Sequence, residues 1–357
     1  MSQRAGLFAY GHDFLRQAVE QTWLTQPDAQ RAAHLAVADY FERHPNQAGM
    51  TPRKAAEWPF QLHAAEAWER LEACLTDIPL FLALYNDRTQ WELTGYWHPL
   101  RAKPLERDMG ACYTRAYRAW SGKLANASDH IVPANLGQFL SENGLYPAAE
   151  PLLRRAHEVC ERVLGPEHPD TLGSVNNLAH LLVIRGDYAG AQPLYERVLE
   201  ARERMLGPEH HDTLISVNKL ALLLLDMGRF GEAEPLLRRS MEGRRKTLGP
   251  DHPNTANGVA GYAMGLMHLK RDDEAAAHAR EALEIWQRSG THEDSRSGKA
   301  HWVLGTVAVR HGDRAAAKQH LEESLRLLLK GHGEQHPWVV AVKKELENLS
   351  EKPNESA

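Results

Sequence analysis

Polar and apolar positions in the second half of the chain recur in the same order every 42 residues. A Leu-Gly-Pro motif begins at Leu164, Leu206 and Leu248, and a histidine follows the first residue of each motif four positions later. Between the motifs, apolar residues return at intervals of three and four, which is the spacing of an amphipathic α-helix. A sequence that repeats at a fixed period of this length predicts stacked helical units, each burying its apolar face against its neighbours.

Small residues mark two places in every unit. We expect a left-handed glycine to end the first helix of four units, at Gly144, Gly186, Gly228 and Gly312, whereas the fourth unit has Lys270 at this position and departs from the pattern. Five positions later comes an alanine, at Ala149, Ala191, Ala233, Ala275 and Ala317, and within the first helix lies another small residue, at Gly137, Ala179, Ala221, Ala263 and Gly305. Small side chains at these positions predict that the two helices of one hairpin approach closely.

The loop that joins successive units carries signals for the start of a helix. Pro169 and Pro253 suit the first helical turn, where the missing amide proton has no partner to lose. Asp170 and Asp212 would lie in the same turn, where the helix dipole favours a negative charge. The sequence leaves open whether His168 or Asp170 caps the helix.

Hairpins with this pattern resemble tetratricopeptide repeats, whose usual period is about 34 residues. The longer unit, with Asn-Asn-Leu-Ala at 176–179, resembles the repeats of kinesin light chain and of nephrocystin-like proteins. The resemblance implies an all-α fold, a tetratricopeptide-like right-handed helical solenoid of five repeats over residues 126–347 that ends in a cap helix. The motif loops depart from the pattern in the fourth and fifth units. Residues 348–357 are expected to form a disordered tail.

Residues 1–125 do not keep the period, although apolar residues at helical spacing predict helices at 14–24 and 29–44, and either one helix or a pair of short helices at 58–77. Six of the nine tryptophans lie before Gly122, and we expect them to belong to a core. The segments GHDFLRQAVE, HLAVADYF, EWPFQLHAAEAWERL and ELTGYWHPL resemble the helical region that follows the ATPase core in NACHT-type STAND signalling ATPases, above all the nephrocystin-like members.

The phosphate-binding motif of such ATPases is missing. Gly122-Lys123-Leu124 and Gly298-Lys299-Ala300 lack the upstream glycine and the Ser or Thr that hold phosphate and Mg²⁺. Nucleotide hydrolysis therefore does not follow from the resemblance, and no cofactor is expected. The chain looks like the downstream part of a STAND protein.

Composition narrows the function further. A net charge of −5 without a basic stripe argues against nucleic-acid binding, and the longest apolar run, which begins at Leu220, is too short to span a membrane. The three cysteines form no CxxC pair, so we expect reduced thiols and a cytoplasmic protein.

Candidate chemistry is sparse. Histidines His168, His210, His252 and His336 recur in the loops, but equivalent residues of stacked repeats lie too far apart to share one zinc ion. No GxSxG motif and no Ser-His-Asp or Cys-His spacing occurs. We therefore expect loop histidines with structural roles, no metal site and no enzymatic activity.

The resemblance implies that the first helix of each hairpin lines a concave binding face. The expected peptide-binding groove consists of Asn135, Gln138, Asn176, Asn177, His180, Asn218, Lys219, Leu222 and Met264. An asparagine amide can hold the backbone of an extended peptide, or it can bond within the helix stack. Leu222 and Met264 fit either the core or an exposed apolar patch. We expect an acidic surround.

These features predict a scaffold or sensor arm that binds another protein or peptide in the groove of the repeats. The alternative is a regulatory subunit, or a fragment, of a STAND-type ATPase that acts through the N-terminal helices. The oligomeric state does not follow from the sequence.

Overall fold

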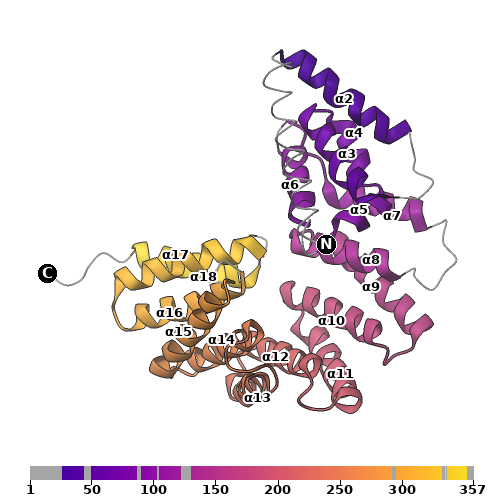
Figure 1. Ribbon diagram of the computed structural model, residues 1–357. Helices are drawn as coiled ribbons and strands as arrows, with labels where there is room; N and C mark the ends of the chain where they lie inside the picture. The colour runs from indigo at the N-terminus through magenta and orange to yellow at the C-terminus, as the bar shows by residue number, and fades with distance from the viewer. Residues whose placement is uncertain are drawn as a thin grey trace. The chain divides into compact units, whose positions relative to one another are not determined.

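The computed structural model describes residues 26–43, 50–86, 90–102, 104–121, 130–291, 295–331, 334 and 336–351. The first expected helix, at 14–24, lies outside these residues. The chain divides into two compact units, Met1–Asn135 and Leu136–Ala357. Every regular element in the described part is helical, as the all-α fold class predicted (Figure 1).

The first unit is built from short helices. They are α2 (Pro27–Arg43), α3 (Pro52–Ala64), α4 (Trp68–Leu75), α5 (Ile78–Leu84), α6 (Gln90–Arg101) and α7 (Met109–Ser121). Of the two alternatives for the stretch at 58–77, the structure has the pair of short helices, because Glu66 adopts a left-handed φ of 52° between α3 and α4. Asp77 caps α5 by accepting a hydrogen bond from the Leu80 amide at 2.9 Å.

Aromatic side chains from three helices form the core of the first unit. The indole of Trp97 on α6 donates a hydrogen bond of 3.1 Å to the Tyr113 hydroxyl on α7. Phe81 on α5 meets the Tyr113 ring edge-on, with the centroids 5.4 Å apart. Among the described tryptophans of this unit, Trp97 is fully buried whereas Trp58, Trp68 and Trp120 are half-buried. The expectation of core tryptophans therefore holds fully for Trp97.

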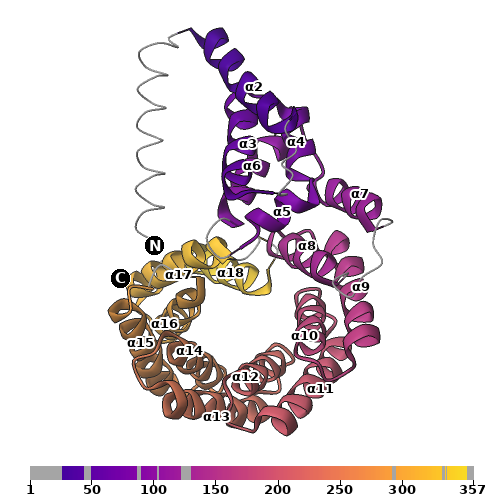
Figure 2. The same cartoon turned by 45° about the vertical axis from the view of Figure 1, so that its right-hand side comes forward.

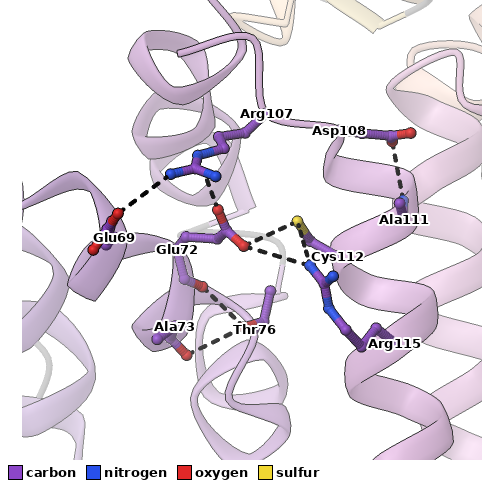
Figure 3. Close-up of polar contacts among 9 residues, drawn as sticks. All are labelled: Glu69, Glu72, Ala73, Thr76, Arg107, Asp108, Ala111, Cys112 and Arg115. Carbon is purple, nitrogen blue, oxygen red and sulfur yellow. Dashed lines mark hydrogen bonds and ion pairs between the residues drawn. The ribbon is translucent and has the colours of Figure 1, made fainter.

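A polar cluster links α4 to α7 (Figure 3). The carboxylate of Glu72 accepts a hydrogen bond from the Cys112 thiol at 3.2 Å and pairs with Arg107 at 3.3 Å and Arg115 at 3.6 Å. Burial, followed by the contact with Glu72, raises the pKa of Cys112 to about 11. This cysteine is therefore a protonated donor at neutral pH.

The second unit consists of stacked hairpins. Helix α8 (Ile131–Glu142) contains the division between the units and pairs with α9 (Tyr146–Leu164). The later hairpins are α10–α11 (Pro169–Ile184 and Tyr188–Leu206), α12–α13 (His211–Asp226 and Phe230–Leu248), α14–α15 (Pro253–His268 and Asp272–Arg288) and α16–α17 (Gly298–Arg310 and Arg314–Gly331). Helix α18 (Pro337–Glu351) follows and includes the first four residues of the expected tail, 348–351.

The loop inside each hairpin begins with a left-handed residue, which the sequence predicted for the four glycines but not for Lys270. The φ angles are 76°, 78°, 73°, 59° and 78° at Gly144, Gly186, Gly228, Lys270 and Gly312. The fourth repeat thus keeps the turn even though lysine replaces glycine.

Close packing inside the hairpins also confirms the role of the small residues. All five alanines that follow the loop are completely buried. A Cβ atom added to Gly137 would lie 2.7 Å from the side chain of Leu153, and one added to Gly305 would lie 2.7 Å from that of Leu321. No larger side chain fits at either glycine without a shift of the facing helix.

The loop histidines are helix caps. The Nδ1 atoms of His168, His210 and His252 accept hydrogen bonds of 3.2, 3.2 and 3.1 Å from the backbone amides two residues later. His336 does the same for the amide of Trp338 at 3.3 Å, at the start of α18. The cap that the sequence left undecided is therefore His168, with Asp170 in the first turn.

Ion pairs join the helices to these loops at a constant step along the array. They connect Arg204 with Glu167, Lys246 with Glu209 and Arg288 with Asp251. The partners are exposed, so each pair contributes little by itself. Their regular recurrence nonetheless shows that the repeats share one geometry.

A concave face to the second unit

The repeats curve, with α10, α12, α14 and α16 on the inner side and α11, α13, α15 and α17 on the outer side (Figure 2). A cavity of about 230 Å³ opens on the inner side. Its lining comes from α10, α11 and α12, from the residues around Ser295–Lys299, and from the start of α18. The lining residues are His180, Val183, Ile184, Tyr195, Asn218, Lys219, Leu222, Leu223, Asp226, Ser295, Arg296, Lys299, His336, Pro337 and Trp338.

A second cavity of about 240 Å³ adjoins the first. His180, Ile184, Lys219 and His336 line both cavities, so the two hollows share a wall. The second one extends toward α8 and α9 through Gln138, Ser141, Glu142, Tyr146, Leu153 and Asn177. We call the two cavities together the inner groove.

Six of the nine predicted groove residues line the inner groove: Gln138, Asn177, His180, Asn218, Lys219 and Leu222. The other three do not line it. Asn135 is half-buried on α8 and falls in the first unit, whereas Asn176 and Met264 are buried, with 8% and 2% of their surfaces exposed. Met264 belongs to the hydrophobic core, which was one of the two roles that the sequence allowed, the other being an exposed apolar patch.

Asn176 and Asn218, which occupy equivalent positions in successive repeats, have different surroundings. Asn176 is enclosed in the stack, and its Oδ1 has no hydrogen-bond partner among the described residues. Asn218 lines the cavity while its own Oδ1 is also buried without a partner. That oxygen lies against Gly261 of the next repeat, where an added Cβ would come within 2.8 Å of it. With its oxygen covered, the Asn218 amide can offer its nitrogen as a donor to a ligand.

Among the described residues that line the first cavity, cationic side chains outnumber carboxyl groups, whereas the sequence led us to expect an acidic surround. Three cationic side chains, Lys219, Arg296 and Lys299, face one carboxyl group, that of Asp226. Burial lowers the pKa values of Lys219 and Lys299 to about 8. Burial also raises the pKa of Asp226 to about 6, although Lys299 opposes the shift. Both lysines are therefore mainly charged at pH 7 but poorly hydrated.

Trp338 supplies an aromatic wall to the same cavity. The Lys299 ammonium lies over its indole ring, with Nζ 3.9 Å from the ring centroid. The His336 ring packs beside it at 4.8 Å between centroids, and the cap formed by His336 fixes the backbone of Trp338. An aromatic face next to a cation can hold an apolar side chain together with its charged neighbour.

Sequence reasoning missed the part of the groove that comes from the fifth repeat and α18. Lys299 and Trp338 lie 80 and 119 positions after Lys219, and no periodic motif relates them to it. The curvature of the array brings them to one cavity. Only the resemblance to curved repeat proteins could have suggested that distant repeats meet there.

The family model of the tetratricopeptide repeat matches the chain over residues 129–204, 172–242, 212–258 and 259–330. These matches together cover more than half of the chain, so the chain belongs to the tetratricopeptide-repeat family. It therefore has the architecture of a protein-interaction scaffold, a fold that is typically non-catalytic.

The chain is also similar to particular proteins. Nephrocystin-3 of Mus musculus is 34% identical over 189 residues, which cover 51% of this chain and 14% of that protein. A putative kinesin light chain of Podosopora anserina with nearly identical TPR-like repeats is 24% identical, with a TM-score of 0.46 over 58% of this chain and 98% of the other. A Rap protein complexed with Competence and Sporulation Factor matches 89% of this chain and 88% of its own, at 13% identity and a TM-score of 0.54.

The chain spans 10% to 14% of the length of the curated relatives it matches. The activities of those whole proteins are therefore not carried over to it. Within the described residues, no helix is long and apolar enough to cross a membrane.

Proposed function

We propose that the repeats bind a partner protein by holding one of its peptide segments in the inner groove. The observation that carries this proposal is the concave hollow itself, in which six predicted groove residues meet. Ligand sites are concave and combine an apolar lining with a few placed polar groups, and the inner groove has both. Ile184 and Leu222 supply apolar surface, while Asn218 and Lys219 supply donors.

The general fold supports the same proposal. Repeats of this family mediate protein–protein binding, and the Rap protein of similar fold was crystallised in complex with Competence and Sporulation Factor. A passive grip requires no movement of the scaffold. The dense packing of the hairpins suits a preformed surface, which binds at a lower entropic cost than a mobile one.

The test uses the full chain as bait for partner proteins from its own cell extract, followed by an affinity measurement with the recovered partner. Asn177→Ala combined with Asn218→Ala removes amides that line the groove, and we expect a loss of affinity of about tenfold with unchanged helicity. Gln287→Ala, an exposed change on the outer helix α15, is the matched control. Equal affinity of the double variant and the control would overturn the groove assignment.

A second candidate function is regulation of an ATPase through the first unit. The observation that favours it is an exposed apolar pair on α2, where Val37 and Tyr40 are 41% and 59% exposed. If this face binds the partner, Val37→Ser with Tyr40→Ser abolishes capture while the asparagine variants retain it. The opposite pattern supports the groove.

A further inference from the structure

Lys219 lies on the wall that the two cavities of the inner groove share. It is one of four residues that line both cavities, and the others are His180, Ile184 and His336. Its side chain comes from α12 of the third repeat and is half-buried. A small molecule in either cavity therefore has access to the Lys219 side chain.

Two influences act on the Lys219 ammonium, and both favour its neutral form. Burial is the larger one, and the positive charge of Arg202 adds to it, so that the pKa of Lys219 falls to about 8. At pH 7 such an amine is neutral in about one molecule of ten, whereas an ordinary lysine is neutral in roughly one of a few thousand. The neutral amine carries a free lone pair, so a desolvated lysine beside another cation is a nucleophile.

The cation beside Lys219 is fixed in place. The guanidinium of Arg202 on α11 donates hydrogen bonds of 3.0 Å to the Asp212 carbonyl and of 2.9 Å to the Ser216 hydroxyl, both on α12. Both acceptors are neutral, so they hold the guanidinium without cancelling its charge. The packing of α11 on α12 therefore keeps a positive charge next to the helix that carries Lys219.

Apolar side chains border Lys219 in the first cavity. Val183 and Ile184 on α10 and Leu222 on α12 line this cavity together with it. The two cavities have volumes of about 230 and 240 Å³, so each is small for a ligand site. A reactant for the Lys219 amine should therefore be small and carry a short apolar substituent.

The other lysine of the groove has different surroundings. Burial lowers the pKa of Lys299 to about 8, but the Asp226 carboxylate opposes the shift and so favours the charged form. The Lys299 ammonium also lies over the Trp338 ring, 3.9 Å from its centroid. The aromatic face and the carboxylate both stabilise an ammonium, which makes Lys219 the better nucleophile of the two.

We propose that Lys219 is a covalent modification site, at which the side-chain amine reacts with a small apolar aldehyde to form an imine in the inner groove. The neutral Nζ attacks the carbonyl carbon with its lone pair, and one of its protons moves to the carbonyl oxygen to give a carbinolamine. The hydroxyl group then leaves as water with the second nitrogen proton, and the C=N double bond forms. The reaction needs no oxidant or reductant.

The modification site uses the inner groove but does not depend on the peptide-binding function above. An adduct on the shared wall takes up space in both cavities. The two occupants therefore compete for one place, although each can be tested without the other.

The experiment treats the full chain with butanal and sodium cyanoborohydride at pH 7, which reduces the imine to a stable secondary amine. Peptide mass spectrometry then gives the labelling rate of each lysine. Lys219 should react at least about tenfold faster than Lys246 and Lys318, although the side chains of those two are 67% and 68% exposed. The same reaction in concentrated urea should remove the difference, because unfolding restores the ordinary pKa.

Two variants check the assignment. Lys219→Arg should abolish the label in the groove and leave the labels on exposed lysines unchanged. Lys246→Arg, an exposed change on α13, is the matched control and should keep the label at Lys219. The site-by-site rates of the original chain need no variant, so the test holds even if Lys219→Arg fails to fold.

The outcomes separate this proposal from peptide binding. Labelling of Lys219 no faster than that of Lys246 in the folded chain overturns the modification site, and so does a preference for Lys299. A preference for Lys219 that persists in urea arises from the local sequence and overturns the role of the groove. All three results leave peptide binding intact, whereas failure of the asparagine variants to weaken partner binding leaves the modification site intact.

Discussion

The substitution Lys270→Gly should stabilise the fourth repeat. Lys270 has a φ of 59° at the end of α14, where the equivalent Gly228 has 73° at the end of α12. The hydrogen bonds of the two turns match: the amide of Lys270 bonds to the Met267 carbonyl at 3.1 Å, and that of Gly228 to the Leu225 carbonyl at 2.9 Å. The lysine therefore keeps a turn whose backbone favours glycine.

The expected gain follows from two opposing terms. A side chain in the left-handed region costs roughly 1–2 kcal/mol. Glycine offsets about 0.4–1 kcal/mol of this gain, because it makes the unfolded chain more flexible and so stabilises the unfolded state. Lys270 is exposed, so its side chain loses little packing when it is removed. The free energy of unfolding should therefore rise by about 0.5–1 kcal/mol in the glycine variant.

Thermal unfolding followed by circular dichroism, with hydrogen exchange of α14 and α15 as the local probe, measures the effect. Lys270→Ala removes the charge and keeps the Cβ atom, so it should show no gain. Gly228→Ala introduces the same strain into the third repeat and should lower stability by about 1 kcal/mol. Equal stability of the glycine and alanine variants at position 270 would refute this explanation of the turn.

Three further predictions concern packing and charge. Gly305→Ala should lower the free energy of unfolding by about 1–3 kcal/mol in a urea titration, because its Cβ would lie 2.7 Å from a leucine of α17, whereas Gly231→Ala, with open space around it, should not destabilise. Glu72→Gln should speed alkylation of Cys112 at pH 8, since the carboxylate raises the thiol pKa; an unchanged rate in the folded protein would contradict that cause. Burial lowers the pKa of His301 to about 4, so on acidification the unfolded chain binds this proton before the folded chain does, and stability should fall as the pH drops below 6.5. His301→Gln should make this fall less steep. A variant whose stability falls with pH in parallel to the original chain would show that His301 is not the cause.

The repeating half of the fold was predictable because its signals are local. A loop residue with positive φ, an alanine five positions later and a capping histidine each act within one hairpin, so periodicity in the sequence translates directly into periodicity in space. The left-handed turn at Lys270 shows the strength of this rule, since the packing of the neighbouring repeats keeps the turn where the residue type does not favour it. The stretch at 58–77 had no comparable signal, so its sequence left open whether it forms one helix or two short ones.

The inner groove was only partly predictable because it depends on curvature. Asn177, His180 and Asn218 could be placed from the first helix of each hairpin, but the same rule also selected Met264, which the core encloses. Adjacent residues of a helix differ by roughly 100° in direction, so Asn177 lines the groove whereas its neighbour Asn176 is buried in the stack. The positions of Lys299 and Trp338 in the groove depend on how far the array bends, and no local sequence pattern encodes the curvature that accumulates over several repeats.

Chemical footprinting of lysines tests the central claim most directly. The full chain is acetylated with and without the groove-binding peptide segment of the recovered partner protein, and each site is quantified by mass spectrometry. Binding in the inner groove predicts that the peptide protects Lys219 and Lys299 while Lys246 and Lys318, which are 67% and 68% exposed, react as before. Unchanged labelling of Lys219 and Lys299 under saturating peptide would contradict it.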